Sequence, residues 1–266
     1  MNRHEQHGIL AVDIGNTNIH IGLWQDDAWR YSWRARTVAG KMADEYAVLL
    51  RSFLASKKLK TKEVTGVAIG SVVPALTGTW ATLAKETLGV EPLVVTHTTK
   101  IGIRIEIDQP EQAGADRIIN AAAAYKLYGG AAVVVDFGTA TNFDVVSGDG
   151  AYRGGAIAPG LNIAHDALVA RAARLHKIDL VPPACIIGTN TIAAMQSGIF
   201  VGHVAMVEGL IARIKREMGD PTVKVIGTGG LAPLFRENTD AIDLIAPELT
   251  LDGLRIIHAM NHGYSA

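Results

Sequence analysis

The sequence has little cysteine and no long uninterrupted apolar run, and each absence narrows the class of protein. Its 266 residues include one cysteine, Cys185, which cannot form an internal disulfide. We expect Cys185 to be a partly buried residue of small size and not a nucleophile. Segment 1–7 is polar and lacks the apolar core of a secretion signal. Gly, Asp or Arg interrupts the apolar runs before the ~18 residues of a membrane span. We therefore expect a cytoplasmic protein with no membrane partner.

An excess of charge of either sign is also missing. The 25 lysines and arginines nearly balance the 26 aspartates and glutamates, so the net charge is -1 and no basic field recruits nucleic acid. A hydrophobic content of 48% with 19% charged residues is typical of a folded globular protein. The chain also lacks the Gly-x-x-x-x-Gly-Lys-Ser/Thr pattern of P-loop kinases. We expect one large or two moderate domains.

One carboxylate, Asp13, lies near the end of an apolar run at residues 9–14, and alternating apolar residues resume at 19–24. This pattern predicts a β-hairpin. Its turn consists of Gly15, Asn16, Thr17 and Asn18. Glycine lets backbone N–H groups approach an anion, and a carboxylate can hold Mg²⁺. The turn therefore suits a phosphate chain with Mg²⁺, although an ordinary hairpin with an Asn-rich turn has the same pattern.

Strands and helices alternate through the rest of the chain. We expect strands at 28–36, 64–71, 93–96, 101–108, 131–136, 142–146, 151–160 and 223–226. We expect helices at 43–54, 74–88, 118–128, 161–175, 190–217 and 249–262, with a short helix after the 227–230 turn. Such an order indicates an α/β protein with mixed sheets.

The hairpin pattern occurs a second time. Asp136 ends the expected strand 131–136, Gly138 and Thr139 begin a turn of small residues, and strand 142–146 returns. This internal repeat predicts two related lobes, residues 1–117 and 118–266. The boundary rests on the repeat alone, because no Pro- or Ser-rich linker separates the halves.

Six motifs, in order, carry a resemblance to a known family. They are 13–18, Gly114-Ala115-Asp116-Arg117, 136–141, 154–160, 188–191 with Ser197-Gly198, and Thr228-Gly229-Gly230. The two hairpins resemble the phosphate elements of the actin, sugar kinase and Hsp70 superfamily. The whole series, over about residues 9–258, resembles the type III pantothenate kinases. The resemblance implies a two-lobed actin-like ATPase (ribonuclease H-like) fold, with duplicated mixed-sheet domains and a cleft between them.

The resemblance also implies an activity, ATP-dependent phosphorylation of pantothenate at the start of coenzyme A biosynthesis. Asp116 would be the general base. Asp13 would hold Mg²⁺, and Asp136 a monovalent cation, K⁺ or NH₄⁺. The residues expected to bind ATP are Asp13, Gly15, Asn16, Thr17, Asn18, Gly138, Thr139, Gly229 and Gly230.

Pantothenate would contact a second set of residues: Ile107, Gly114, Ala115, Asp116, Arg117 and Thr191. Ile107 stands where many family members carry Tyr, so an aromatic or hydroxyl contact with the substrate is absent. The family resemblance implies a homodimer in which Thr191 reaches pantothenate across the interface. Helix 190–217 is the expected interface element.

Two alternatives from other classes remain open. Residues 227–232 also fit the Gly-x-Gly-x-x-Ala fingerprint of a dinucleotide site, but Asp240 and Asp243 follow after only about 10 residues, where about 20 is usual. An ATP-binding regulatory protein would keep the fold and need no catalytic base, so the presence of Asp116 argues against it. His258 and His262, four residues apart, lack the His-Glu-x-x-His context of a zinc site and fit the end of a helix.

Overall fold

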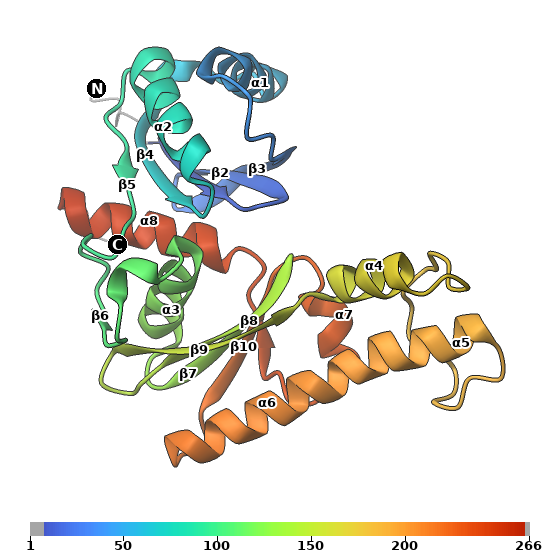
Figure 1. Ribbon diagram of the computed structural model, residues 1–266. Helices are drawn as coiled ribbons and strands as arrows, with labels where there is room; N and C mark the ends of the chain where they lie inside the picture. Colours follow the sequence, from blue (N-terminus) through green and yellow to red (C-terminus); the bar gives the residue numbers. More distant parts are fainter. Residues whose placement is uncertain (1–7, 264–266) are drawn as a thin grey trace. The chain divides into compact units, whose positions relative to one another are not determined.

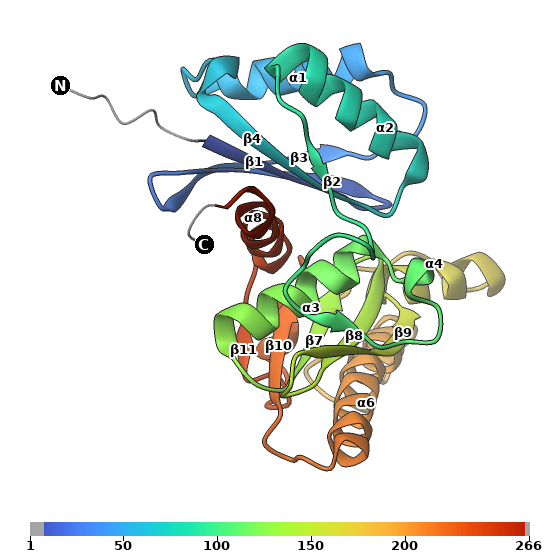
Figure 2. The same ribbon diagram turned by 90° about the vertical axis from the view of Figure 1, so that its left-hand side faces the viewer.

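The computed structural model describes residues 8–263, which form two compact units (Figures 1 and 2). The first unit runs to Tyr128 and also contains helix α8 (Leu249–His262), and the second unit is Gly129–Glu248. These units differ from the lobes predicted at 1–117 and 118–266. The predicted boundary falls inside helix α3 (Ala115–Tyr128), and the final helix returns to the first unit. The sequence repeat shows where the second set of strands begins. It does not show that α3 and α8 pack on the first sheet.

The first unit is built on a sheet in the order β3 (Ala28–Arg36), β2 (Asn18–Gln25), β1 (Gly8–Ile14), β4 (Val64–Ser71) and β5 (Leu93–Val94). The first three strands are antiparallel neighbours, whereas β4 lies parallel to β1 and β5 parallel to β4. The predicted hairpin at 9–24 is therefore confirmed. The strand predicted at 101–108 shrinks to β6 (Arg104–Ile105), which is not part of this sheet and is the sixth strand of the other one.

Helices cover both faces of this sheet. Leu10, Val12 and Ile14 of β1 are fully buried in one cluster with residues of α1 (Ala43–Ser56) and α2 (Pro74–Leu83), including Tyr46 and Trp80. A π-helical turn at Ala84–Leu88 extends α2, so the helix predicted at 74–88 is confirmed. Short 3₁₀ helices occupy Thr61–Glu63 and Pro110–Gln112.

Helices α3 and α8 cover the opposite face, where glycines let them approach closely. A Cβ on Gly66 of β4 would lie 2.7 Å from the ring of His258 in α8. A Cβ on Gly253 of α8 would lie 2.5 Å from Ile119 of α3. Larger side chains at these glycines would push the helices away from the sheet and from each other. His258 is 3% exposed and stacks on His262 with ring centroids 4.1 Å apart, so it belongs to the packed part of α8.

Burial of His258 predicts that the protein loses stability in mild acid. Burial, and to a smaller extent nearby His262, lowers the pKa of His258 to about 4. An unfolded chain protonates histidine near pH 6.5, so this contribution to stability is complete above that pH and disappears as the pH falls towards 4. We expect urea unfolding to show a loss of about 2 kcal/mol from His258 between about pH 7.5 and 5. His258→Gln should abolish this pH-dependent loss of stability, whereas His97→Gln, at an exposed site, should show the same loss as the wild type. Equal pH slopes in H258Q and the wild type would contradict the assignment.

The second unit repeats the strand plan of the first. Five strands of the second, six-stranded sheet belong to this unit, in the order β9 (Ala151–Pro159), β8 (Ala140–Val146), β7 (Ala132–Phe137), β10 (Lys224–Thr228) and β11 (Leu244–Ile245). Strands β7, β8 and β9 are antiparallel neighbours, and β10 and β11 continue in parallel. Strands β1 to β5 and β7 to β11 thus pair in the same order and directions. The predicted duplication is confirmed at the level of topology.

The helices of the second unit are α4 (Leu161–Arg171), α5 (Thr191–Gln196), α6 (Gly202–Met218) and α7 (Ala232–Arg236). A π-helical turn at Ser197–Val201 joins α5 to α6, so the predicted helix 190–217 is confirmed as one continuous helix. Its core face packs with Val133, Val135 and Phe137 of β7. Helix α4 ends at Arg171 and not at the predicted residue 175.

Two expectations about composition are corrected. Contrary to the expectation that no segment suits a membrane span, the continuous helix Thr191–Met218 is long and apolar enough to pass that test. A single such helix is weak evidence of a membrane span, because core helices of soluble proteins pass the same test. Cys185 is exposed and not partly buried. It lies in an irregular segment, 172–190, where no sheet or helix covers it.

Candidate active site

The first candidate phosphate turn follows β1. The N–H of Gly15 donates to the carbonyl oxygen of Asn18 at 3.0 Å and closes the turn. The side chains of Asn16, Thr17 and Asn18 are exposed. Asp13, one residue before the end of β1, is half-buried and pairs in register with His20 of β2. The turn therefore presents polar groups outward beside a partly shielded carboxylate.

Strand alternation places Asp13 on the face that α3 and α8 cover. Its neighbours Val12 and Ile14 point into the cluster of α1 and α2, so Asp13 points the other way. On the adjacent strand, Asp13 is in register with Gly70, above which lies Ile119 of α3, 2.6 Å from where a Cβ would be. Asp116 is one turn before Ile119 and so shares its side of the helix. The first unit thus brings Asp13 and Asp116 to one face of one sheet.

Asp116 lies in the first turn of α3, and its local sequence makes room for the carboxylate. A Cβ on Gly114 would be 2.6 Å from Asp116 Oδ1, so a larger residue there would require the carboxylate to shift. The N–H of Arg117 donates to Asp116 Oδ1 at 2.8 Å. Burial raises the pKa of Asp116, and the hydrogen bond and charge of Arg117 oppose that rise. A half-buried carboxylate with a raised pKa is well suited to accepting a proton.

The second candidate turn follows β7 in the other unit. The N–H of Gly138 donates to the carbonyl oxygen of Ala140 at 3.0 Å, and Gly138 and Thr139 are exposed. Asp136 pairs in register with Asn142 of β8 and with Thr228 of β10. It stands one residue before the end of β7, as Asp13 does on β1.

Gly229 lies directly against this second carboxylate. Its φ is +87°, and a Cβ there would be 2.6 Å from Asp136 Oδ1 and 2.7 Å from the carbonyl oxygen of Phe137. Glycine is therefore required both by the backbone conformation and by the space. The arrangement places the backbone of Gly229 directly beside Asp136 and the start of the β7–β8 turn.

Comparison with known proteins decides the family. A family model described as type III pantothenate kinase matches residues 9–213. A protein named type III pantothenate kinase from Roseiflexus sp. (strain RS-1) is 48% identical over 253 residues, which cover 95% of this chain and 99% of the relative. The chain belongs to the type III pantothenate kinase family. It is accordingly a kinase of coenzyme A biosynthesis, which acts on ATP and pantothenate.

Solved structures establish the fold of this pantothenate kinase. An inorganic polyphosphate/ATP-glucomannokinase from Arthrobacter sp. strain KM matches with a TM-score of 0.52 at 15% identity, over 96% of this chain and 100% of that one. A Campylobacter jejuni protein described as a Baf family transcriptional activator matches with a TM-score of 0.61 at 20% identity, over 96% and 99% of the two chains. At these identities the likeness concerns the fold alone. The predicted actin-like fold is confirmed.

The remaining predicted substrate residues lie apart from the two turns in sequence. Ile107 is half-buried in the irregular segment after β6, and Arg117 is half-buried in α3. Thr191 is exposed at the first position of α5, where the side chain of Asn190 caps the helix by accepting the N–H of Ala193 at 2.9 Å. Thr191 is in the second unit, whereas Ile107 and the 114–117 motif are in the first.

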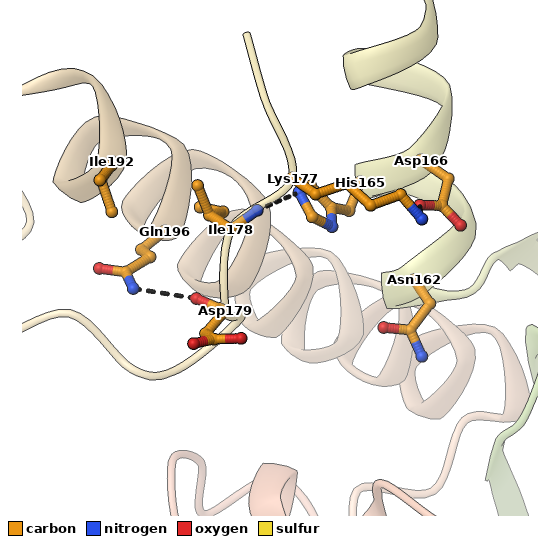
Figure 3. A pocket seen from close by; sticks show the side chains of 8 residues that line it. All are labelled: Asn162, His165, Asp166, Lys177, Ile178, Asp179, Ile192 and Gln196. Atoms are coloured by element: carbon orange, nitrogen blue, oxygen red, sulfur yellow. Dashed lines mark hydrogen bonds and ion pairs between the residues drawn. The ribbon is translucent and has the colours of Figure 1, made fainter.

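Sequence reasoning missed a polar pocket of about 640 Å³ in the second unit (Figure 3). It lies between α4, the 177–179 segment and α5. Buried His165 accepts the N–H of Ile178 at 3.3 Å, and Lys177 pairs with Asp166 at 2.8 Å. The lining residues are Asn162, His165, Asp166, Lys177, Ile178, Asp179, Ile192 and Gln196. Of the lining residues, Ile192 directly follows the 188–191 motif. The sequence gives no other indication of this pocket.

Proposed function

We propose that this kinase transfers the γ-phosphoryl group of ATP to the 4′-hydroxyl of pantothenate, with Asp116 as the general base. The observation that carries the proposal is the carboxylate of Asp116, raised in pKa by burial and held on the same face of the first unit as Asp13. A hydroxyl that attacks a phosphoryl group must lose its proton, and a positioned carboxylate accepts it. Gly114 leaves the space that this carboxylate needs.

The two turns are proposed to hold the phosphate oxygens of ATP. Gly15, Asn16, Thr17 and Asn18 would form the first binding turn, and Gly138, Thr139, Gly229 and Gly230 the second. The N–H groups of Gly15 and Gly138 close their own turns, so the donors would come from the other residues. No cluster of three His, Cys, Asp or Glu side chains suited to a metal occurs within residues 8–263. A single carboxylate, Asp13, fits Mg²⁺ nonetheless, because this ion commonly uses one or two carboxylates and takes its other ligands from phosphates and water. When bound, Mg²⁺ would neutralise charge on the phosphates.

A monovalent cation, K⁺ or NH₄⁺, is proposed to bind at Asp136. Asp136 Oδ1 and the carbonyl oxygen of Phe137 both lie against the backbone of Gly229, since a Cβ there would be 2.6 and 2.7 Å from them, so the two oxygens are near neighbours. Carboxylate and carbonyl oxygens are suitable ligands for a hard cation. The proposal rests on this pair of donor types, a carboxylate beside a backbone carbonyl.

Replacing K⁺ with Na⁺ should lower the rate of phosphoryl transfer if this cation site operates. We expect Asp136→Asn to lose the preference for K⁺, because the amide carries no charge to hold the ion. Asp149→Asn, in the exposed turn after β8, is the matched control and should keep the preference. The measurement is the initial rate with MgATP in potassium, ammonium or sodium buffer. A wild-type rate indifferent to the cation would instead make Asp136 a structural carboxylate.

Pantothenate is proposed to contact Ile107, Gly114, Ala115, Asp116 and Arg117, with Thr191 supplied by a second copy of the chain. Support for a homodimer comes from the exposed large apolar side chains, most of which, among the described residues, belong to β9, α4, α5 and the segment between these helices. Those on these elements are Ile157, Ile163, Leu168, Val181, Ile186, Ile187 and Ile192. Exposed apolar residues mark an interaction surface where they form a contiguous patch, which is what we propose for this set. An exposed free thiol, Cys185, suits a reducing compartment, and we propose that the enzyme acts in the cytoplasm.

The decisive experiment is to incubate the purified protein with pantothenate, ATP, Mg²⁺ and K⁺ and to identify the product by mass spectrometry. Formation of 4′-phosphopantothenate is the expected result. Nucleotide binding without this product would favour an ATP-binding regulatory protein, and tight binding of a nicotinamide dinucleotide would favour the alternative reading of residues 227–232.

A further inference from the structure

In each unit, the residue directly after the third antiparallel strand, β3 or β9, donates a hydrogen bond to the candidate phosphate turn. Thr37 follows β3, which ends at Arg36, and its N–H donates to the carbonyl oxygen of Thr17 at 2.9 Å. Gly160 follows β9, which ends at Pro159, and its N–H donates to the carbonyl oxygen of Thr139 at 3.2 Å. Thr17 and Thr139 are each the last turn residue before the returning strand. The duplicated fold thus makes the same contact twice.

The first unit adds a side-chain contact to this backbone bond. The hydroxyl of Thr37 donates to the carbonyl oxygen of Gly15 at 2.6 Å, so one residue holds two carbonyl groups of the same turn. In the second unit no side chain fits at the corresponding place. A Cβ on Gly160 would lie 2.2 Å from the carbonyl oxygen of Thr139 and 2.7 Å from that of Gly138. Thr37 and Gly160 therefore make the equivalent backbone bond to their turns, but only the first unit has room for a side chain at this position.

Holding a carbonyl fixes the direction of the N–H that follows it. In a trans peptide the C=O and the next N–H point in opposite directions. Because the Gly15 carbonyl points to Thr37, the N–H of Asn16 must point away from β3. Likewise, the bond from Gly160 to the Thr139 carbonyl directs the N–H of Ala140 away from Gly160. A turn that binds an anion needs its N–H groups pointing to the ligand and its carbonyl oxygens pointing elsewhere.

We propose that Thr37 and Gly160 are positioning residues for ATP, which hold the carbonyl groups of the two phosphate turns so that the turn N–H groups face the phosphates. This inference rests on the proposed function of the turns. Neither residue touches the reacting atoms, so each acts through the turn it holds. The polar sequence of each turn indicates which residues could donate to phosphate. It does not indicate that Thr37 and Gly160 hold the turns.

Thr37→Val keeps the shape of the side chain and removes the hydroxyl donor, leaving the Gly15 carbonyl without that bond. We expect the KM for MgATP to rise about tenfold, with the KM for pantothenate within about twofold of the wild type. Thr37→Ser restores the hydroxyl and should restore the KM. Thr65→Val is the matched control, because Thr65 makes the same kind of bond, to the Gly8 carbonyl at 3.4 Å, near the other end of β1. An unchanged KM for MgATP in T37V, or an equal rise in both KM values, would overturn the proposal.

Hydrogen exchange tests the same inference without relying on activity. The amides of residues 15–18 should exchange faster in T37V than in the wild type, and at the wild-type rate in T37S and T65V. Unchanged exchange in T37V would refute the positioning role even if the enzyme phosphorylates pantothenate. If the wild type makes no product while T37V shows faster exchange in the turn, the proposed function fails and the role of Thr37 in holding the turn stands.

Gly160→Ala tests the second unit. The new Cβ must displace the Thr139 carbonyl, so we expect a rise of more than about tenfold in the KM for MgATP and faster exchange at residues 138–140. Gly148→Ala, in the turn after β8, is the control, because its Cβ would meet nothing nearer than 3.8 Å. A folded G160A with the wild-type KM for MgATP would overturn the proposal for this unit, while the T37V result decides the first unit independently.

Discussion

Replacing Asp116 with asparagine should lower the turnover of pantothenate by roughly two to four decades while the fold remains intact. The amide has nearly the size of the carboxylate and can accept the same N–H from Arg117, so the start of α3 is preserved. It cannot accept the proton of the attacking hydroxyl. Since Asp116 is proposed to act on the acceptor alcohol, the KM for MgATP should stay within about twofold of the wild type.

The same variant should be at least as stable as the wild type. Burial raises the pKa of Asp116 in the folded protein, so the folded state binds this proton more readily than the unfolded chain. At neutral pH, therefore, keeping the ionised carboxylate in place costs stability, and the cost diminishes as the pH falls through the raised pKa. Asparagine removes this cost. A higher melting temperature together with lost turnover would be the signature of a functional carboxylate that is held at the expense of stability.

Asp44→Asn is the matched control for this experiment. Asp44 also lies in the first turn of a 14-residue helix of the first unit, α1, but it is exposed. Its replacement should leave turnover unchanged. The pH dependence of turnover offers a second readout. In the wild type and D44N, the midpoint of its acid limb should lie above the ordinary carboxyl pKa. A near-normal rate in D116N would remove Asp116 from the mechanism.

The hairpins and turns could be predicted from the sequence because their signals are local. Apolar alternation on either side of Gly15 and Gly138 predicts two strands and a turn, and the structure has them at β1–β2 and β7–β8. The family motifs then placed Asp13 and Asp136 at the same position of equivalent strands, which the register confirms.

Contacts between distant segments could not be predicted in this way. The periodicity of α8 indicates a helix with a buried face, but not that Gly66 of β4 accommodates its His258 and so places it in the first unit. Thr37 shows why the site was only partly predictable. Nothing in the local pattern around it suggests a role, because its two bonds reach back about twenty residues along the chain to Gly15 and Thr17.

Replacing Asp13 with asparagine should lower kcat/KM for MgATP by about two to three decades, since a metal on the phosphates contributes several kcal/mol to the transition state. The amide is a neutral and weaker ligand for Mg²⁺, so higher concentrations of the metal should recover part of the rate. Asparagine fits the half-buried site beside His20 and Gly70, and we expect the fold to be kept.

The contrast with D116N makes the two assignments separable. D13N should alter the dependence on Mg²⁺, whereas D116N should lower kcat at every Mg²⁺ concentration. Asp27→Asn, at a φ of 57° in the turn between β2 and β3, is the control for D13N because asparagine adopts that conformation readily. If D13N kept the wild-type Mg²⁺ dependence, the carboxylate of Asp13 would not hold the metal. The outward donors of residues 15–18 would then have to bind the phosphates without an adjacent carboxylate ligand for Mg²⁺ in the first unit.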